Sequence, residues 1–341
     1  MPLFNKEMTV NELRLALSES KKIVITTHHK PDGDAMGSSL GLYHFLCSLG
    51  HEVHVVTPSD YPYFLHWMPG HPDVIDFTKD PERAAELVSK ADWVFCVDFN
   101  ALSRINELGE LVRASSAKKA MIDHHLEPEG FEDFRYWDTT SCAAAEMVYR
   151  LIVELELTSH INKDVATCLY TGIMTDSGSF RFPSTTANVH RIIADLIDAG
   201  ANNSHIHELI YDTNSENRLK FLGRVLGEKM IVIPSLHTAY MAIDYALLEE
   251  YNIVTGDTEG IVNYALSIHG IKLAALIIDR GPICKLSFRS KGEFPANEIA
   301  KKFFSGGGHR NAAGGMSTES LEKTVKKFLD VLPEFEYLLT E

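Results

Sequence analysis

Short apolar runs alternate with longer segments of helical spacing along the first two thirds of the chain. The runs rich in β-branched and aromatic residues predict strands, and the segments between them predict helices. This alternation is typical of a parallel sheet flanked by helices. The expected strands are Ile23–Thr27, Glu52–Thr57, Asp92–Asp98 and Lys119–Ile122; the expected helices are Ala35–Leu49, Pro81–Lys90, Ser103–Ser115, Thr139–Leu155, Lys163–Met174, Thr186–Ala199 and Asn203–Tyr211.

The polar stretch Asp212–Glu216 is the most linker-like segment of the chain. Because 341 residues exceed one ordinary core, we expect two domains, residues 1–212 and 213–341. Beyond the linker, Lys272–Asp279 and Ile283–Arg289 predict an antiparallel strand pair joined by a tight turn. The predicted fold class is therefore α/β, with a larger N-terminal domain on a parallel sheet and a smaller C-terminal α/β domain on a mixed sheet.

Polar side chains follow the first expected strand in an H-x-x-P-D-x-D spacing. His28, Asp32 and Asp34 lie around Pro31 and Gly33, which predict a tight turn that lets the side chains converge. One imidazole and two carboxylates favour a divalent cation such as Mn²⁺ or Mg²⁺ over a soft metal. Taken alone, such a turn is more often a solvated helix start. The neighbouring His29 could replace His28, but the spacing to Asp32 favours His28.

Three further positions support the metal interpretation. Asp98 ends a nearly continuous apolar strand, and Asp176 lies in a TDSGSFRF segment after an expected helix. Another strand runs directly into Asp123, His124 and His125, a cluster for which capping or exposure is a poor explanation. Because adjacent residues at a strand end point to opposite sides, one imidazole can bind metal while the other faces substrate and Asp123 orients a ring.

The overall composition limits the classes of function. The formal charge of −15 argues against a protein that binds duplex DNA, although metal ions could still attract a small phosphorylated substrate. No apolar run approaches the ~20 residues that span a bilayer, and the first residues do not resemble a signal peptide. The five cysteines are scattered, so we expect reduced thiols and a cytoplasmic protein without membrane contact.

Candidate anion-binding features occur in both halves. The segment from Lys285 to Arg310 contains six Lys/Arg residues and two acidic residues. It is therefore locally basic although the chain as a whole is acidic, which suggests contact with an anion. This segment ends in SGGGHRNAAGG, where glycines permit close backbone approach and His309 and Arg310 offer donors to phosphate. In the first half, the Thr/Ser start of the helix at Thr139 predicts amide groups for an anion, and Arg181 is a candidate phosphate clamp.

The candidate ligands of the first domain form one set: His28, Asp32, Asp34, Asp98, His124 and Asp176. Six such groups suit two metal ions ~4 Å apart that share one carboxylate and lower the pKa of a water toward ~7. The implied chemistry is attack of a metal-activated hydroxide on phosphorus. We predict that Asp98 bridges the metals and that His125 holds the scissile phosphate and protonates the leaving group.

These motifs, in this order, resemble the DHH phosphoesterase superfamily over nearly the full chain. In particular they are similar to the NrnA-type group, bifunctional oligoribonucleases and phosphatases of 3′-phosphoadenosine 5′-phosphate (pAp). The resemblance implies a DHH catalytic domain, a DHH-associated substrate-binding domain and an active site in the cleft between them. It also implies two Mn²⁺ ions, replaceable by Mg²⁺ or Co²⁺, on the six ligands named above. The substrate-binding residues that it implies are Arg104, Arg181, Arg289, Ser290, Gly306, Gly307, Gly308, His309 and Arg310.

The leading hypothesis is a phosphohydrolase for very short single-stranded RNA and pAp, either as a monomer or as a homodimer. Cleavage of linear or cyclic dinucleotides is the main alternative. Exopolyphosphatase or pyrophosphatase activity fits less well with the glycine-rich second domain. A RecJ-type exonuclease would need more domains than this length allows, and a catalytically dead nucleotide-binding module would lack a ligand.

Overall fold

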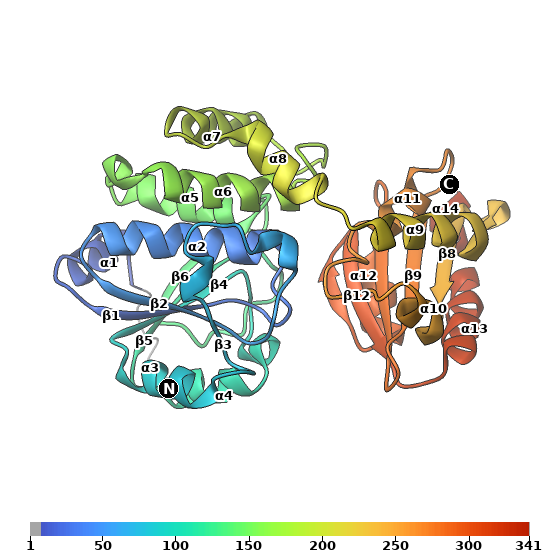
Figure 1. Cartoon of the computed structure of the whole chain (residues 1–341), viewed down its shortest axis with the longest axis horizontal. Helices are drawn as coiled ribbons and strands as arrows, with labels where there is room; N and C mark the ends of the chain where they lie inside the picture. The colour runs from blue at the N-terminus through green and yellow to red at the C-terminus, as the bar shows by residue number, and fades with distance from the viewer. Residues whose placement is uncertain (1–7, 341) are drawn as a thin grey trace. The chain divides into compact units, whose positions relative to one another are not determined.

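The first structural unit is built on a six-stranded sheet whose strands are all parallel. The computed structural model describes residues 8–340, and within them this unit ends at Thr213 (Figure 1). The sheet order is β3-β2-β1-β4-β5-β6. The strands are β1 (Lys22–Thr26), β2 (Glu52–Thr57), β3 (Ile75–Asp76), β4 (Trp93–Val97), β5 (Lys118–Asp123) and β6 (Phe134–Trp137).

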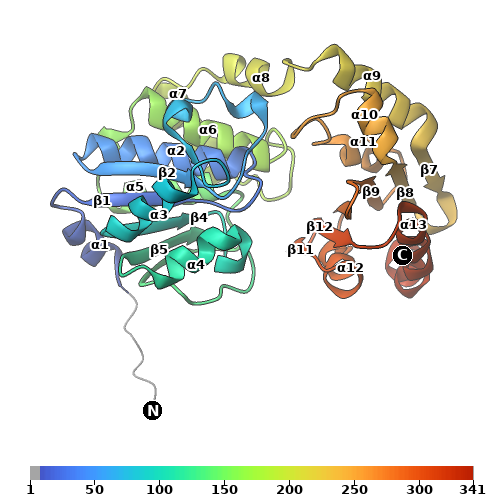
Figure 2. The ribbon, with the colours of Figure 1, turned by 60° about the horizontal axis from the view of Figure 1, so that its bottom comes forward.

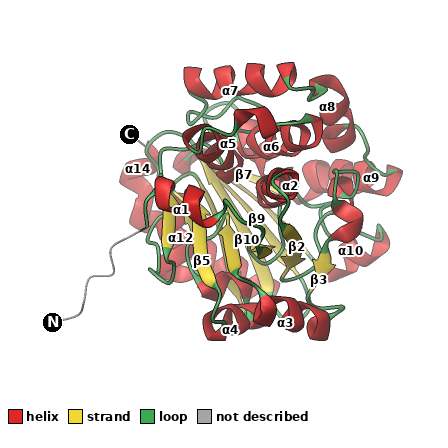
Figure 3. Cartoon of the chain, turned by 90° about the vertical axis from the view of Figure 1, so that its left-hand side faces the viewer, coloured by secondary structure: helices red, strands yellow, loops and turns green. Residues whose placement is uncertain are grey.

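Helices cover both faces of this sheet, as Figure 3 shows. One face packs on α1 (Val10–Ala16), α2 (Gly33–Ser48), α5 (Ala144–Glu154) and α6 (Lys163–Asp176), with α7 (Ala187–Asp198) and α8 (Asn203–Tyr211) outside them. The other face packs on α3 (Pro81–Lys90) and α4 (Glu107–Ala114). Alternate residues of each strand enter the two cores, so Ile23 and Ile25 face α2 while Val24 faces the opposite layer.

The second unit begins at Asn214 and contains a mixed sheet of order β11-β12-β10-β9-β8-β7. Within this second sheet, only the β8–β9 pair is parallel among the described strands. The strands are β7 (Met230–Ile233), β8 (Thr238–Ile243), β9 (Leu273–Asp279), β10 (Cys284–Ser290), β11 (Gly307–His309) and β12 (Ala312–Ser317).

Helices also cover both faces of the second sheet (Figure 2). The core on one face includes α9 (Glu216–Arg224), α10 (Tyr245–Glu250) and α11 (Ile261–Ser267). The core on the other includes α12 (Ala296–Phe303), α13 (Leu321–Val331) and α14 (Glu336–Thr340). The predicted α/β class with one parallel and one mixed sheet is confirmed. No helix among residues 8–340 has the length and apolar character needed to cross a bilayer.

Several predicted elements differ from the structure. The helix expected from Thr139 begins at Ala144, because residues 139–143 form a turn and a short extended segment. The helix expected at Ser103–Ser115 is a 3-10 turn, Leu102–Ile105, followed by α4; Asn106, with a φ of 51°, separates them. The glycine-rich loop expected at residues 305–315 is the hairpin of β11 and β12.

Candidate metal centre

The carboxyl ends of three neighbouring strands carry the polar motifs. His28 follows β1, Asp98 follows β4, and Asp123 ends β5 just before His124 and His125. After β1 the chain adds β2 and β3 on one side of β1 in the sheet, and it then adds β4, β5 and β6 on the other side. The direction in which strands are added therefore reverses between β1 and β4. Ligands of open α/β sheets bind at such a reversal, outside the carboxyl ends of the strands.

His28, Asp32 and Asp98 form a first group of potential ligands. His28 Nε2 lies 3.5 Å from Asp98 Oδ2 and 3.8 Å from Asp32 Oδ2. Asp32 caps α2, and its Oδ1 accepts hydrogen bonds from the backbone N–H groups of Asp34 and Ala35 at 3.0 and 3.1 Å. The cap therefore fixes Asp32 while its second oxygen faces the imidazole.

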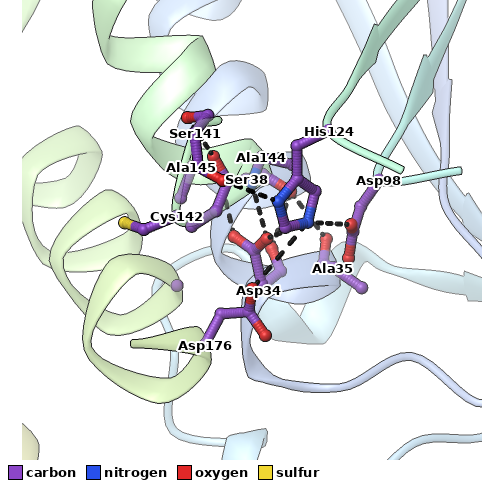
Figure 4. Close-up of polar contacts among 12 residues, drawn as sticks. Asp34, Ala35, Ser38, Asp98, His124, Ser141, Cys142, Ala144, Ala145 and Asp176 are labelled. Carbon is purple, nitrogen blue, oxygen red and sulfur yellow. Dashed lines mark hydrogen bonds and ion pairs between the residues drawn. The ribbon is translucent and has the colours of Figure 1, made fainter. Parts of the chain in front are cut away.

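Asp34, His124 and Asp176 form a second group, drawn in Figure 4. His124 Nε2 lies 3.8 Å from Asp34 Oδ2 and 3.8 Å from Asp176 Oδ2. The first-turn amides of α5 hold Asp34, since Ala144 N donates to Oδ2 at 2.6 Å and Ala145 N donates to Oδ1 at 2.9 Å. The anion that these amides bind is thus a carboxylate of the chain itself, and the sequence-based expectation of free amides at Thr139 is wrong.

Asp98 lies between the two groups. Its Oδ2 faces His28, and its Oδ1 lies 3.4 Å from His124 Nε2. The residue has a left-handed φ of 64°, a conformation that aspartate tolerates better than most residues. Asp98 Oδ1 is buried, and among residues 8–340 no donor makes a hydrogen bond to it.

The donor set fits bound cations. His28 Nδ1 lies 3.0 Å from the His29 carbonyl oxygen, and His124 Nδ1 lies 3.2 Å from the Ser141 carbonyl oxygen. Because a carbonyl only accepts, each Nδ1 must carry a hydrogen, so each ring, once Nε2 has lost its proton to a metal ion, would present the Nε2 lone pair to that ion. This tautomer, with its outer hydrogen bond, is the usual arrangement of metal-bound histidine.

The pKa shifts of these side chains also indicate a site for positive charge. Burial alone would lower the pKa of His28, but Asp32 and Asp98 outweigh it and raise the pKa to about 10. Burial likewise opposes a charge on His124, yet the surrounding carboxylates raise its pKa well above the usual value. Burial would raise the pKa of Asp98, but the His124 and His28 imidazoles hold it well below its usual range. Burial and neighbouring carboxylates raise the pKa of Asp34. The cluster therefore requires compensating positive charge.

His125 belongs to a third group with Asp123 and Asp98. Its Nδ1 lies 2.7 Å from the buried Asp123 Oδ1 and 3.6 Å from Asp98 Oδ1. The Trp137 indole N–H donates to the His125 carbonyl oxygen at 2.7 Å. Sequence reasoning missed Trp137 because β6 is a short strand without clear alternation.

The predicted phosphate-binding residues have varied surroundings. In the first unit, the Arg104 carbonyl accepts from His29 N at 2.8 Å, and Arg181 Nε donates to the Gly178 carbonyl at 2.6 Å. His29 itself is exposed, whereas His28 lies among the carboxylates.

In the second unit, the predicted substrate-binding residues lie in β10 or at the β11–β12 hairpin beside it. Ser290 is buried and donates to the Phe294 carbonyl at 2.7 Å, and Arg310 binds the Glu293 carbonyl and carboxylate. Arg289 Nη1 donates to the Phe288 carbonyl at 2.9 Å.

The three glycines before His309 differ in the space around them. A Cβ on Gly306 would lie 2.0 Å from the Gly314 oxygen, and a Cβ on Gly308 would lie 2.6 Å from the Ala312 oxygen. A Cβ on Gly307 would meet nothing within 4 Å. The positions Gly306 and Gly308 thus permit close pairing inside the hairpin, which also includes His309 in β11.

Known proteins share both the sequence and this fold. The model of the DHH family, N-terminal domain, matches residues 22–173, and that of the DHHA1 domain matches residues 236–336. The bifunctional oligoribonuclease and PAP phosphatase NrnA of Thermus thermophilus is 31% identical over 316 residues, covering 92% of this chain and 89% of that protein. The cyclic-di-AMP phosphodiesterase GdpP of Geobacillus thermodenitrificans is 24% identical over 95% of this chain but 49% of its own length.

A solved structure extends the similarity to three dimensions. The crystal structure of an exopolyphosphatase-related protein from Bacteroides fragilis is 39% identical, with a TM-score of 0.93 and 97% of each chain covered. The similarity thus includes both sheets, and the matched N-terminal region contains the strand ends that carry His28, Asp98 and Asp123–His125. This chain belongs to the DHH family of phosphoesterases.

Proposed function

We propose that this chain is a metal-dependent phosphohydrolase that degrades very short oligoribonucleotides and removes the 3′-phosphate of pAp. The observation that carries the proposal is the position of Asp98, whose Oδ2 faces His28 and whose Oδ1 faces His124, so that it links His28 and Asp32 with the group Asp34, His124 and Asp176. The NrnA relative, matched along most of both chains, supports this choice of substrates.

Two cations would be held by the six residues that the sequence analysis singled out. His28, Asp32 and Asp98 Oδ2 would hold one ion; Asp34, His124, Asp176 and Asp98 Oδ1 would hold the other. When bound, such ions supply positive charge that makes a water more acidic and stabilises charge on phosphoryl oxygens. We propose Mn²⁺ as the natural ion, with Mg²⁺ or Co²⁺ as substitutes, because mixed imidazole and carboxylate ligands suit such metals.

His125 and Asp123 would act on the substrate side of the centre. Asp123 Oδ1 accepts from His125 Nδ1 at 2.7 Å, which fixes the ring. With a second proton on Nε2, His125 would donate to a phosphoryl oxygen and pass that proton to the leaving oxygen. Trp137 restrains the same residue through its backbone carbonyl.

Binding of the remainder of the substrate would involve both units. Arg104 and Arg181 are the candidates in residues 1–212, which we propose as the catalytic domain. In residues 213–341, the DHHA1 match supports a substrate-binding domain that uses Arg289, the Gly306–Gly308 segment and His309. The contacts of Ser290 and Arg310 within the second unit favour a supporting role for these two residues.

A second candidate function is hydrolysis of linear or cyclic dinucleotides. The similarity to GdpP along 95% of this chain favours it. The same metal centre would serve both reactions, so the difference lies in how the nucleoside parts are bound.

A substrate panel tests the proposal. Purified full-length protein with Mn²⁺ is assayed against a diribonucleotide, pAp, cyclic di-AMP, a long single strand and polyphosphate. We expect the highest kcat/KM for the diribonucleotide or pAp. A clear preference for polyphosphate or for cyclic di-AMP would contradict the proposed substrates, and no activity on any of them would contradict the phosphohydrolase itself.

A further inference from the structure

The first turn of α5 and the residues just before it contact two of the proposed metal ligands. The Ser141 carbonyl accepts from His124 Nδ1, while the amides of Ala144 and Ala145 bind the two oxygens of Asp34 (Figure 4). The helix itself has no side-chain cap, because Ala143 occupies the N-cap position. Another group must therefore hold this turn in place.

Glu146, in the first turn of α5, makes the contacts that hold this turn. Its side chain is buried, with the residue 5% exposed, and its Oε2 accepts from Ser141 Oγ at 2.7 Å and from Cys142 N at 2.8 Å. A buried carboxylate is costly unless donors satisfy it, and charge-assisted hydrogen bonds are the stronger kind. Glu146 therefore fixes both residues at the start of the turn.

We propose that Glu146 is a positioning residue of the metal centre. It fixes the position of the Ser141 carbonyl, which selects the His124 tautomer. It also fixes the position of the α5 amides that orient Asp34. Glu146 touches neither ligand directly, so it acts through Ser141–Ala145. This inference rests on the proposed function, because it assigns Glu146 to the ion held by Asp34, His124 and Asp176.

The alternative role for Glu146 is support of the helix start alone. Glu146 lies at the third helical position, where an acidic residue commonly stabilises the first turn. That role would change the unfolding temperature but not the affinity for metal in the folded protein. Metal affinity and stability therefore have to be measured separately.

The test uses the full-length variants Glu146→Ala and Glu146→Gln, with Glu154→Gln as the matched control. Glu154 lies at the other end of α5, is exposed, and accepts from Tyr136 Oη at 2.5 Å. Mn²⁺ binding is followed by the electron paramagnetic resonance signal of the free ion, and thermal unfolding is recorded on metal-free protein. We expect one of two Mn²⁺ dissociation constants to rise about 10–100-fold in Glu146→Ala, the range for groups that orient metal ligands.

The conservative variant covers the case in which Glu146→Ala does not fold. Glu146→Gln keeps the shape but weakens the acceptor, and we expect a smaller rise in the same dissociation constant, with Glu154→Gln unchanged. Unchanged Mn²⁺ affinity in the folded Glu146 variants, with a lower unfolding temperature, would overturn the inference and leave the proposed function intact. A wild-type protein that binds no Mn²⁺ would overturn both.

Discussion

At the scale of single residues, Asp98 is the most informative position. Its left-handed backbone and its place after β4 direct one carboxylate oxygen to each ligand group. We predict that Asp98→Asn, which keeps the shape and tolerates the same backbone, lowers kcat/KM on every substrate at least ~100-fold, because a shared anionic ligand is lost.

The control for this change lies at the other end of the same strand. Asp92, just before β4, accepts from Lys22 N at 2.8 Å and is far along the strand from the carboxyl edge. Asp92→Asn should keep its activity. Activity and circular dichroism are measured on both variants, and an active Asp98→Asn protein would refute the shared-ligand assignment.

The pKa of His28 leads to a prediction on pH. In the metal-free protein Asp32 and Asp98 outweigh burial and raise this pKa to about 10, so the imidazole is protonated at neutral pH. A metal ion must displace that proton, and apparent Mn²⁺ affinity should therefore rise with pH, up to ~10-fold per unit for each proton displaced. Titration calorimetry in buffers of different ionisation enthalpy counts the released protons; His28→Gln should release about one fewer. Affinity that is flat between about pH 6 and pH 8 would contradict this assignment.

The motifs singled out in advance side chains that the structure brings together, because metal chemistry restricts the residue types and their spacing. They did not reveal Glu146 or Trp137, which act through backbone groups. A buried glutamate in the third position of a helix looks like an ordinary cap in sequence. Only the hydrogen bonds of Ser141 and Cys142 connect it to His124 and Asp34.

At the scale of elements, the contact of α2 with α6 and α5 determines where Asp34 lies. A Cβ on Gly172 of α6 would come within 2.6 Å of Ala145 Cβ and 2.9 Å of Asp34 Oδ1. We predict that Gly172→Ala lowers the free energy of unfolding by ~1–3 kcal/mol, because overpacking forces the helices apart. The same displacement should weaken Mn²⁺ binding.

The glycine of a different helix provides the comparison. A Cβ on Gly223 of α9 would meet nothing within 4 Å. Gly223→Ala should therefore raise the free energy of unfolding by ~0.5–1 kcal/mol and leave metal binding unchanged. Urea denaturation of both variants measures the difference; equal effects at the two glycines would mean that the α2–α6 approach is not tight.

Most long elements could be predicted from the sequence because their apolar periodicity is clear. The helices Pro81–Lys90 and Asn203–Tyr211 and the strand Glu52–Thr57 have the predicted bounds. The short strands β3 and β6 carry too few residues for a period to appear. The start of α5 also could not be predicted, since Asp34, distant in sequence, supplies the acceptor for its first amides.

At the scale of the whole molecule, the two units have separate cores. All six proposed ligands belong to the first unit, so metal should stabilise that unit alone. We predict two calorimetric transitions, and we expect Mn²⁺ to raise the midpoint temperature of only one of them. At an Mn²⁺ concentration of 100 times the dissociation constant, the free energy of unfolding of that unit should increase by about 2.7 kcal/mol. Chelation should reverse the shift. Equal shifts of both transitions would contradict an assignment of the metals to the first unit.

Anomalous diffraction from a crystal of this protein soaked in Mn²⁺ shows whether Asp98 lies between two metal ions. The prediction is two anomalous peaks, one on each side of Asp98. His28 and Asp32 should contact one, and Asp34, His124 and Asp176 the other. A single peak, no peak, or manganese bound away from these side chains would contradict it.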